Sequence, residues 1–237
     1  MSELLLNLVE NPDDFPNVSK ACQAPDGLLA FSTKLSEALV IEAYQRGIFP
    51  WYEDGSPVLW WCPSQRCVLW PSHLKIRRSL RKRLRNSKYH FTVNCAFEDV
   101  IRWCAEIPRK GQNGTWITED MRKVYISLHR SAIAHSIEVW ENDVLIGGLY
   151  GIRIGGMFCG ESMFSRRPDA SKMALAVLCQ LSLNTGVSVI DCQLPTEHLM
   201  SLGAVTIPRS EFIELLKRER QKSGIEWPCG PIKWQAQ

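Results

Sequence analysis

The sequence predicts an α+β fold centred on an antiparallel sheet, and the order of its apolar runs leads to this prediction. Three strand-like runs, HSIEVWE, VLIGGLYGI and MFCGESMF, follow one another from residue 135 with only short turns between them. Strands this closely spaced form an antiparallel meander. A long apolar helix, a strand, a short helix, another strand and a charged helix come next. This succession of strands and helices is typical of α+β proteins.

The composition is that of a globular protein with enough apolar residues for a sizeable core. Of the 237 residues, 45% are hydrophobic and 22% are charged. The first residues, MSELLLNLVENPDD, lack a basic start, so we expect no signal peptide. Residues 173–190 are uncharged but contain several polar side chains, so we expect no transmembrane helix. These features predict a cytoplasmic protein that has no membrane partner.

The cysteines indicate thiols rather than a metal site. Nine are present, an odd number without a CxxC pair. Cys62, Cys67 and His73 are spaced too loosely to predict a zinc site. We therefore expect reduced, mostly buried thiols and no metal or other cofactor.

The first 70 residues are expected to form a small, aromatic-rich N-terminal domain, followed by a catalytic domain over residues 71–237. Prolines such as Pro12, Pro16, Pro25 and Pro50 interrupt the N-terminal region, which therefore reads as largely irregular. A short helix is predicted over residues 36–46, because its apolar residues have helical spacing and Gly47 suits a helix C-terminus. The segment GIFPWYEDGSPVLWWCP then concentrates aromatic side chains in a turn-rich stretch.

A strongly basic segment marks the start of the second domain. Eight basic residues and no acidic one lie between residues 75 and 88; they are Lys75, Arg77, Arg78, Arg81, Lys82, Arg83, Arg85 and Lys88. Without them the chain has 20 basic and 25 acidic residues, so the positive charge is concentrated here. A narrow apolar stripe predicts a docked basic helix over residues 74–86. This pattern favours nucleic-acid binding, with an anionic membrane surface as the alternative.

The remaining elements follow from local patterns. We expect a strand over 91–94, a helix over 96–106 and a helix from the N-cap Thr118 to about residue 131. After the meander, Asp169 or Ser171 opens the long helix and Gly186 closes it. The strand VSVIDCQL, a helix over 197–202, the strand AVTIP and a helix over 210–221 complete the domain. The tail WPCGPIKWQAQ is expected to be irregular.

Two carboxylates and an amide stand out in apolar strands. By strict alternation, Asp191 and Gln193 share one face of VSVIDCQL, and Glu161 lies within MFCGESMF. A buried carboxylate is costly unless it is paired or used. The alternative interpretation of Asp191 is that it caps a neighbouring element. The alternative interpretation of Glu161 is a salt bridge to Arg166 or Arg167. Set among apolar side chains, the three groups indicate a pocket with a few convergent polar groups.

Several common sites are absent from the sequence. It contains no GxxxxGK[ST] loop, no GxGxxG after a strand and no GxSxG elbow. Nucleoside triphosphates, dinucleotides and nucleophilic serine catalysis are therefore not expected. A basic helix together with an apolar pocket suggests that a nucleic acid delivers a small apolar group to the site.

Seven long motifs of the sequence together resemble one known protein family. The segments AYQRGIFPW, LWWCPSQRCVLWP, GTWIT, AHSIEVWENDVLIGGLYG, FCGESMFSRRPDASKMAL, IDCQLPTEHLMSLGA and IPRSEF resemble the leucyl/phenylalanyl-tRNA–protein transferase family over about residues 23–215. The resemblance implies transfer of leucine or phenylalanine from aminoacyl-tRNA to proteins beginning with Arg or Lys, marking them for N-end rule degradation. It also implies an acetyltransferase-like (GNAT) domain with a mixed, largely antiparallel sheet behind a smaller N-terminal domain.

The resemblance also implies roles for individual residues. Asp191 and Gln193 match the family's catalytic pair, and Glu161 matches its pocket glutamate. The residues expected to bind substrate are Trp51, Trp116, Tyr125, Leu149, Phe158, Leu178 and Ser182. Leu149, Leu178 and Ser182 replace bulkier residues, which bears on the preference between leucine and phenylalanine. The basic residues between 75 and 88 are expected to contact tRNA, and the protein is expected to be a monomer.

Two other functions fit parts of this pattern. An acetyl-CoA-dependent N-acetyltransferase would share the fold, but its [QR]xxGx[GA] loop has only the poor candidate RIGGMF, in a hairpin turn. A non-catalytic RNA-binding module would explain the basic helix but not Asp191 and Glu161.

Overall fold

An eight-stranded mixed sheet forms the centre of the computed structural model, which describes residues 6–107, 117–223 and 225–235. All neighbouring strands are antiparallel except β9 and β10, which run parallel. In spatial order the strands are β11 (Val205–Pro208), β5 (Gln65–Leu69), β10 (Val189–Gln193), β9 (Met157–Ser165), β8 (Val144–Ile154), β7 (Ala134–Glu141), β6 (Tyr89–Val93) and β12 (Gly230–Ile232). The predicted fold class, α+β with a mixed, largely antiparallel sheet, is confirmed.

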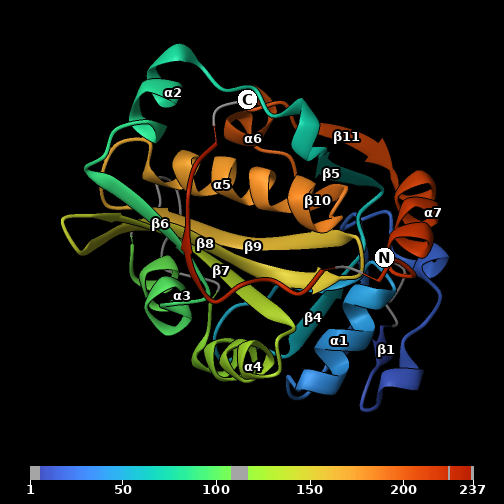
Figure 1. Cartoon of the computed structure of the whole chain (residues 1–237). Helices are drawn as coiled ribbons and strands as arrows, with labels where there is room; N and C mark the ends of the chain where they lie inside the picture. The colour runs from blue at the N-terminus through green and yellow to red at the C-terminus, as the bar shows by residue number, and fades with distance from the viewer. Residues whose placement is uncertain (1–5, 108–116, 224, 236–237) are drawn as a thin grey trace.

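Helices cover both faces of this sheet (Figure 1). The long apolar helix α5 (Ala170–Thr185) packs on one face, and α3 (Phe97–Glu106) and α4 (Glu119–Arg130) pack on the other. Each face has its own cluster of buried apolar side chains. The sheet is therefore the middle layer of three, as expected when both faces of a sheet are apolar.

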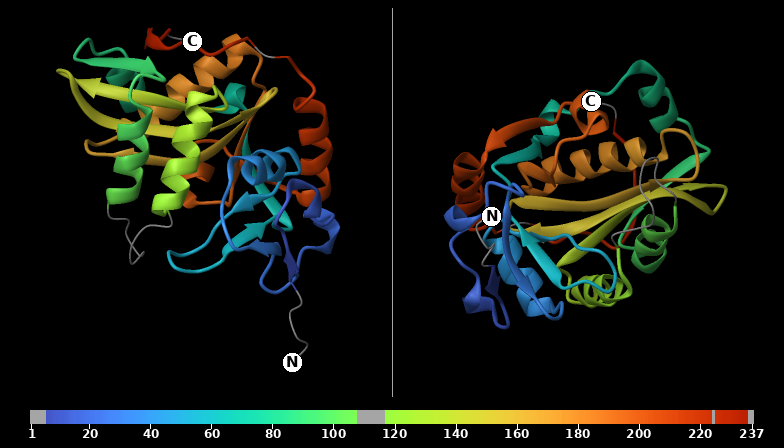
Figure 2. Two further views of the ribbon diagram at one scale, coloured as in Figure 1. Left: turned by 90° about the horizontal axis from the view of Figure 1, so that it is seen from below. Right: turned by 180° about the vertical axis from the view of Figure 1, so that it is seen from behind.

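A second, four-stranded sheet lies in the N-terminal part of the chain (Figure 2). Its spatial order is β1 (Asn7–Leu8), β2 (Leu28–Ser32), β4 (Val58–Trp61) and β3 (Phe49–Pro50). The prediction of a largely irregular N-terminal region is therefore wrong. These strands are only two to five residues long, and β2 pairs with distant segments on both of its sides, so local patterns do not reveal them.

The expected boundary at residue 70 does not coincide with the division between the two sheets. Strand β5 lies before residue 70 but belongs to the eight-stranded sheet, so the division falls between β4 and β5. The two parts also share one apolar cluster, because Tyr44 and Trp60 pack in the same cluster as Tyr125 and Tyr150. The N-terminal part is thus fused to one face of the larger sheet.

The elements predicted from local signals are confirmed. Helix α1 (Glu37–Gln45) is followed by Gly47, whose φ of +79° lies in the left-handed region. The Asn142–Asp143 turn between β7 and β8 has positive φ at both residues, as a two-residue hairpin turn requires. Helix α5 begins after Asp169 and ends at Gly186. The short α6 (Glu197–Ser201) and α7 (Arg209–Glu219) also form as expected.

Two expected elements differ in extent. The basic helix α2 (Arg78–Leu84) is shorter than residues 74–86, and it docks by burying Leu80 and Leu84 against the core on the α5 side. The tail is not wholly irregular, because residues 230–232 add β12 to the edge of the sheet beside β6. Within the described residues, no helix is both long and apolar enough to span a bilayer.

Candidate active site

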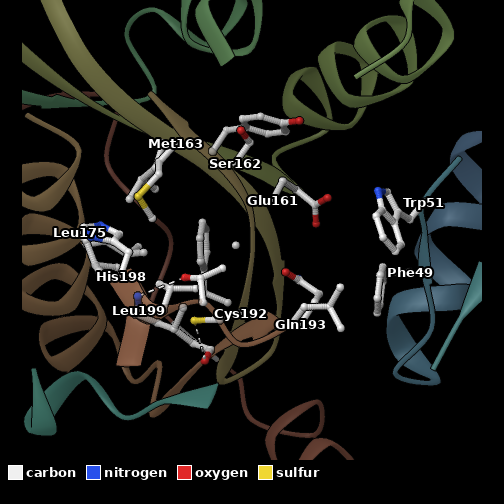
Figure 3. Close-up of a pocket in the computed structure, with 18 of the residues that line it drawn as sticks. Phe49, Trp51, Glu161, Ser162, Met163, Leu175, Cys192, Gln193, His198 and Leu199 are labelled. Atoms are coloured by element: carbon white, nitrogen blue, oxygen red, sulfur yellow. Dashed lines mark hydrogen bonds between the residues drawn. The ribbon is translucent and has the colours of Figure 1, made fainter. Parts of the chain in front are cut away.

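A cavity of about 460 Å³ opens between the ends of β9 and β10 and the N-terminal part of the chain (Figure 3). Its walls are mainly apolar and come from β8, β9, β10, α5 and α6, with Phe49 and Trp51 on the opposite side. The apolar lining consists of Leu149, Phe158, Met163, Leu175, Leu178, Ile190, Leu194 and Leu199. Such a cavity favours an apolar group, whereas the few polar side chains at its wall fix orientation.

Glu161 is the carboxyl group at the wall of this cavity. It projects from β9 toward the gap that faces Trp51 (Figure 3). The Tyr44 hydroxyl donates to its Oε1 at 2.5 Å, the Tyr125 hydroxyl donates to its Oε2 at 3.1 Å, and the two hydroxyl oxygens lie 3.1 Å apart. Burial raises the pKa of Glu161 to about 7, although both tyrosine hydrogen bonds lower it. The carboxylate therefore exchanges protons near neutral pH.

The alternative of a salt bridge for Glu161 is wrong. Arg166 instead donates to the carbonyl of Leu145 and stacks on Trp103, and Arg167 pairs with Glu141. The tyrosines that contact Glu161 come from α1 and α4, so the N-terminal part of the chain helps to build this wall.

A β-bulge at the end of β10 breaks the alternation expected for Asp191 and Gln193. Asp191 pairs with Val68 and Gln193 pairs with Cys67. Val68 and Cys67 are adjacent on β5, whereas Asp191 and Gln193 are separated by one extra residue on β10. Gln193 has a positive φ of 54°. As a result, Cys192 and Gln193 both line the cavity, whereas Asp191 does not. The expectation that Asp191 and Gln193 share a face is therefore wrong.

Asp191 forms a buried ion pair with Arg66 on the opposite face of the sheet. Nε and Nη2 of Arg66 donate to Oδ1 and Oδ2 of Asp191, each at 2.7 Å, and the residues are 1% and 0% exposed. Oδ1 also accepts the backbone N–H of Gln193 at 3.0 Å. Burial alone lowers the pKa of Arg66, but the Asp191 carboxylate outweighs it, so the pKa is raised above its ordinary value. Arg66 therefore keeps its charge although it is buried.

Arg66 connects this pair to the N-terminal part of the chain. Its guanidinium lies 4.8 Å from the ring centre of Phe49 and 4.4 Å from that of Phe212, and Nη1 donates to the carbonyl of Gly47 at 3.1 Å. Phe49 in turn lines the cavity. Arg66 was missed in the sequence, although an arginine beside the apolar run CVLW is a signal of a buried charge.

The other predicted substrate residues divide into four groups. Leu149, Phe158 and Leu178 line the cavity, as does Trp51, which is 43% exposed. Tyr125 does not line the cavity, but its hydroxyl donates a hydrogen bond to Glu161, which does. Ser182 is buried in α5 away from the cavity wall, and Trp116 lies outside the described residues. Phe49, Met163, Leu175 and Ile190 also line the cavity but could not be recognised in the sequence, because apolar residues of core and cavity look alike; His198 lines it as well.

The basic segment is exposed around α2. Seven of its eight basic side chains are exposed, and only Arg83 is partly buried. Arg83 pairs with Asp169 at 3.2 Å and Lys88 pairs with Glu141 at 2.6 Å. Among the described residues, no carboxylate forms an ion pair with the other six, which are Lys75, Arg77, Arg78, Arg81, Lys82 and Arg85. This surface is therefore an uncompensated positive patch.

Within the described residues no group of His, Cys, Asp or Glu side chains has the arrangement of a metal site. The site instead combines an apolar cavity, an amide and a carboxyl group whose pKa is near neutral. This combination is that of an acid–base enzyme that holds an apolar group beside the reacting atoms.

Comparison with known proteins assigns the particular family. Residues 68–217 match the leucyl/phenylalanyl-tRNA protein transferase family, and residues 33–64 match the N-terminal domain of that family. A leucyl/phenylalanyl-tRNA–protein transferase from Hydrogenovibrio crunogenus is 47% identical over 97% of this chain and 90% of its own length. One from Pseudomonas syringae pv. syringae is 48% identical over 94% and 98%. The chain therefore belongs to the leucyl/phenylalanyl-tRNA protein transferase family and is an aminoacyltransferase.

Solved structures show more distant likeness. A GCN5-related N-acetyltransferase from Kribbella flavida overlaps 77% of this chain and 65% of its own, with 12% identity and a TM-score of 0.40. The structure of L-PGS from Bacillus licheniformis covers 86% of this chain, with 13% identity and a TM-score of 0.37. At these scores the overlap supports no conclusion beyond the sheet described above.

Proposed function

We propose that this protein transfers leucine or phenylalanine, and also methionine, from aminoacyl-tRNA to the N-terminal α-amine of proteins that begin with Arg or Lys. The observation that carries this proposal is the apolar cavity with Glu161 and Gln193 at its wall. In this function the cavity takes the amino-acid side chain, and the polar groups act on the ester that joins it to tRNA. The modified proteins would be marked for degradation by the N-end rule pathway, and the enzyme would act in the cytoplasm as a monomer.

The cavity supports selection by side-chain polarity. Its walls offer aliphatic and aromatic carbon, which leucine, phenylalanine and methionine side chains fill without losing hydrogen bonds. A charged side chain would be desolvated there without a partner, which costs several kcal/mol or more. Leu149 and Leu178 border the cavity and set its width, so they are the residues through which the preference between leucine and phenylalanine is tuned.

Glu161 is the proposed proton acceptor of the reaction. The acceptor α-amine arrives as an ammonium and must lose a proton before it attacks the ester carbonyl. A base with a pKa of about 7 is well matched to that task at neutral pH. Tyr44 and Tyr125 hold the carboxylate oxygens in place, and the same negative charge attracts an acceptor that carries Arg or Lys.

Gln193 is the proposed donor to the ester carbonyl. Its Nε2 is buried and has no hydrogen-bond partner among the described residues, which is costly unless a ligand supplies one. As the amine attacks, negative charge develops on the carbonyl oxygen, and an amide N–H aimed at that oxygen stabilises it. The bulge on β10 brings this side chain to the cavity wall.

We propose a different role for Asp191 from the catalytic one that the family resemblance implies. Its oxygens are occupied by Arg66 and by the backbone of Gln193, and it does not line the cavity. We assign it to holding the bulge, and therefore Gln193, in position.

The exposed basic segment supports the tRNA part of the proposal. Six unpaired cations around α2 suit phosphate contacts, which position a nucleic acid without reading its sequence. Neither alternative function accounts for this patch and the cavity together.

One experiment separates the three candidate functions. The protein is incubated with radiolabelled Leu-tRNA and an Arg-starting peptide, and in parallel with radiolabelled acetyl-CoA and the same peptide. We expect label on the peptide only from Leu-tRNA, and none on a peptide whose α-amine is acetylated beforehand. Transfer from acetyl-CoA alone would establish an acetyltransferase, and tRNA binding without transfer would establish an RNA-binding module.

A further inference from the structure

Two cysteines face each other across β5 and β10 at the bulge beside the cavity. Cys67 pairs in register with Gln193, and Cys192 is the extra residue that the bulge inserts between Asp191 and Gln193. Opposed residues of antiparallel strands have Cα atoms about 4.5–5.5 Å apart. A disulfide spans Cα atoms about 4.4–6.8 Å apart, so this position suits one.

The two thiols interact directly. The Cys192 thiol donates a hydrogen bond to the Cys67 sulfur, and this bond lowers the pKa of Cys67, although burial opposes it. The same hydrogen bond, followed by burial, raises the pKa of Cys192 well above its ordinary value. After the first ionisation the negative charge therefore lies on Cys67 and the remaining proton on Cys192, and the pair ionises as a unit.

Only one of the two sulfurs reaches the cavity. Cys67 is 0% exposed and packs in the core on the α5 side. Cys192 is partly buried and lines the cavity, where it lies beside Gln193 (Figure 3). A small solute in the cavity can therefore meet Cys192, and Cys67 lies behind it as a resolving partner.

We propose that Cys67 and Cys192 are a reversible oxidation site, at which peroxide in the empty cavity forms a disulfide that switches the enzyme off. The Cys67 thiolate takes the proton of Cys192 as the Cys192 sulfur attacks hydrogen peroxide; an S–O bond forms, the O–O bond breaks and hydroxide leaves. The Cys67 sulfur then displaces the sulfenic hydroxyl of Cys192 and gives up its proton. In total, two thiols and one peroxide become one disulfide and two waters.

The disulfide acts on the site through the bulge. It draws the Cys192 sulfur away from the cavity wall toward β5 and constrains the backbone next to Gln193, whose φ is already positive. A displacement of about 1 Å at a reacting group can lower the rate about 10²-fold. The loss of activity rests on the proposed function, whereas formation of the disulfide does not.

The test uses the full chain with Cys95→Ser and Cys229→Ser, because those exposed thiols also lie beside each other and would oxidise. This parent is exposed briefly to dilute hydrogen peroxide, alkylated and digested, and its peptides are identified by mass spectrometry. Transfer from Leu-tRNA is measured before oxidation, after it and after dithiothreitol. We expect a peptide linked through Cys67 and Cys192, a loss of transfer of about 10²-fold and recovery on reduction.

Cys67→Ala in the same parent is the informative variant, and Cys104→Ala, a buried thiol on α3, is its matched control. We expect the Cys67→Ala protein to keep its transfer activity through peroxide and the Cys104→Ala protein to lose it reversibly. Irreversible oxidation of Cys192, a disulfide elsewhere or undiminished transfer by the linked protein would overturn the proposal. If Cys67→Ala fails to fold, the presence or absence of the linked Cys67–Cys192 peptide in the parent decides whether the disulfide forms. A protein that forms the disulfide but transfers nothing before oxidation would refute the proposed function instead.

Discussion

Replacing Glu161 by glutamine removes the carboxyl group of the cavity wall while keeping its size and its hydrogen-bond acceptor for the tyrosines. In the wild type, burial raises the pKa of Glu161 from its ordinary value of 4.5 to about 7. A carboxyl group whose pKa is raised by folding stabilises the folded state below its unfolded pKa. That contribution is lost as the pH rises through the folded pKa.

The size of the effect follows from the pKa. One pKa unit corresponds to about 1.4 kcal/mol, so a rise from 4.5 to about 7 corresponds to about 3 kcal/mol at most. The wild type should lose this amount of unfolding free energy between about pH 4.5 and pH 8, whereas Glu161→Gln should not. The difference in unfolding free energy, variant minus wild type, should therefore grow by up to about 3 kcal/mol over that interval.

The assay is urea denaturation at a series of pH values from 4.5 to 8, followed by tryptophan fluorescence. Glu141→Gln is the matched control, because Glu141 also lies on a strand but its pKa is lowered, first by the Lys88 hydrogen bond. Its variant should differ from the wild type by a nearly constant amount over this interval, because the stabilising contribution of a carboxyl group with a lowered pKa is already complete above its ordinary value of 4.5. A Glu161→Gln difference that stays constant with pH would show that Glu161 ionises normally, and the proposed base would then lack its physical support.

Further predictions concern catalysis, packing, tRNA and selectivity. Glu161→Gln should lower single-turnover transfer about 10²–10⁴-fold, and Tyr44→Phe should shift the pH–rate profile to higher pH, because it removes a hydrogen bond that lowers the pKa of Glu161. Arg66→Met should lower the free energy of unfolding, measured by urea denaturation, by about 3–5 kcal/mol, because it leaves Asp191 unpaired. Adding Asp191→Leu should restore this stability without restoring transfer. A double variant that is as unstable as Arg66→Met would contradict this reasoning. Four arginines, Arg77, Arg78, Arg81 and Arg85, should be neutralised together. The slope of the logarithm of the tRNA binding constant against the logarithm of the salt concentration should then become shallower by nearly one unit per lost phosphate contact. An unchanged slope would exclude this surface as the tRNA site. Leucine, phenylalanine and methionine should all be transferred, because a methylene changes binding by only about 1–3 kcal/mol, whereas efficient transfer of aspartate or lysine from tRNA would contradict an apolar cavity.

Much of the fold could be predicted because its signals are local. The helix stop at Gly47, the Asn142–Asp143 turn and the left-handed Gly186 each follow from what a few neighbouring residues can adopt. The N-terminal strands could not be predicted, since they are only two to five residues long and β2 pairs with segments far away in the chain on both of its sides. For the same reason the predicted boundary at residue 70 missed that β5 belongs to the larger sheet.

The sequence alone determined the local chemistry of this protein: the concentration of positive charge, the carboxylates set in apolar strands and the motifs of the family. Only the tertiary structure decided how those groups are used. Tyr44 reaches Glu161 across 117 residues, and Arg66 reaches Asp191 across 125. A bulge that depends on pairing with β5 turns Gln193, rather than Asp191, toward the cavity. Contacts between distant segments depend on how the sheets pack, and no local periodicity encodes them.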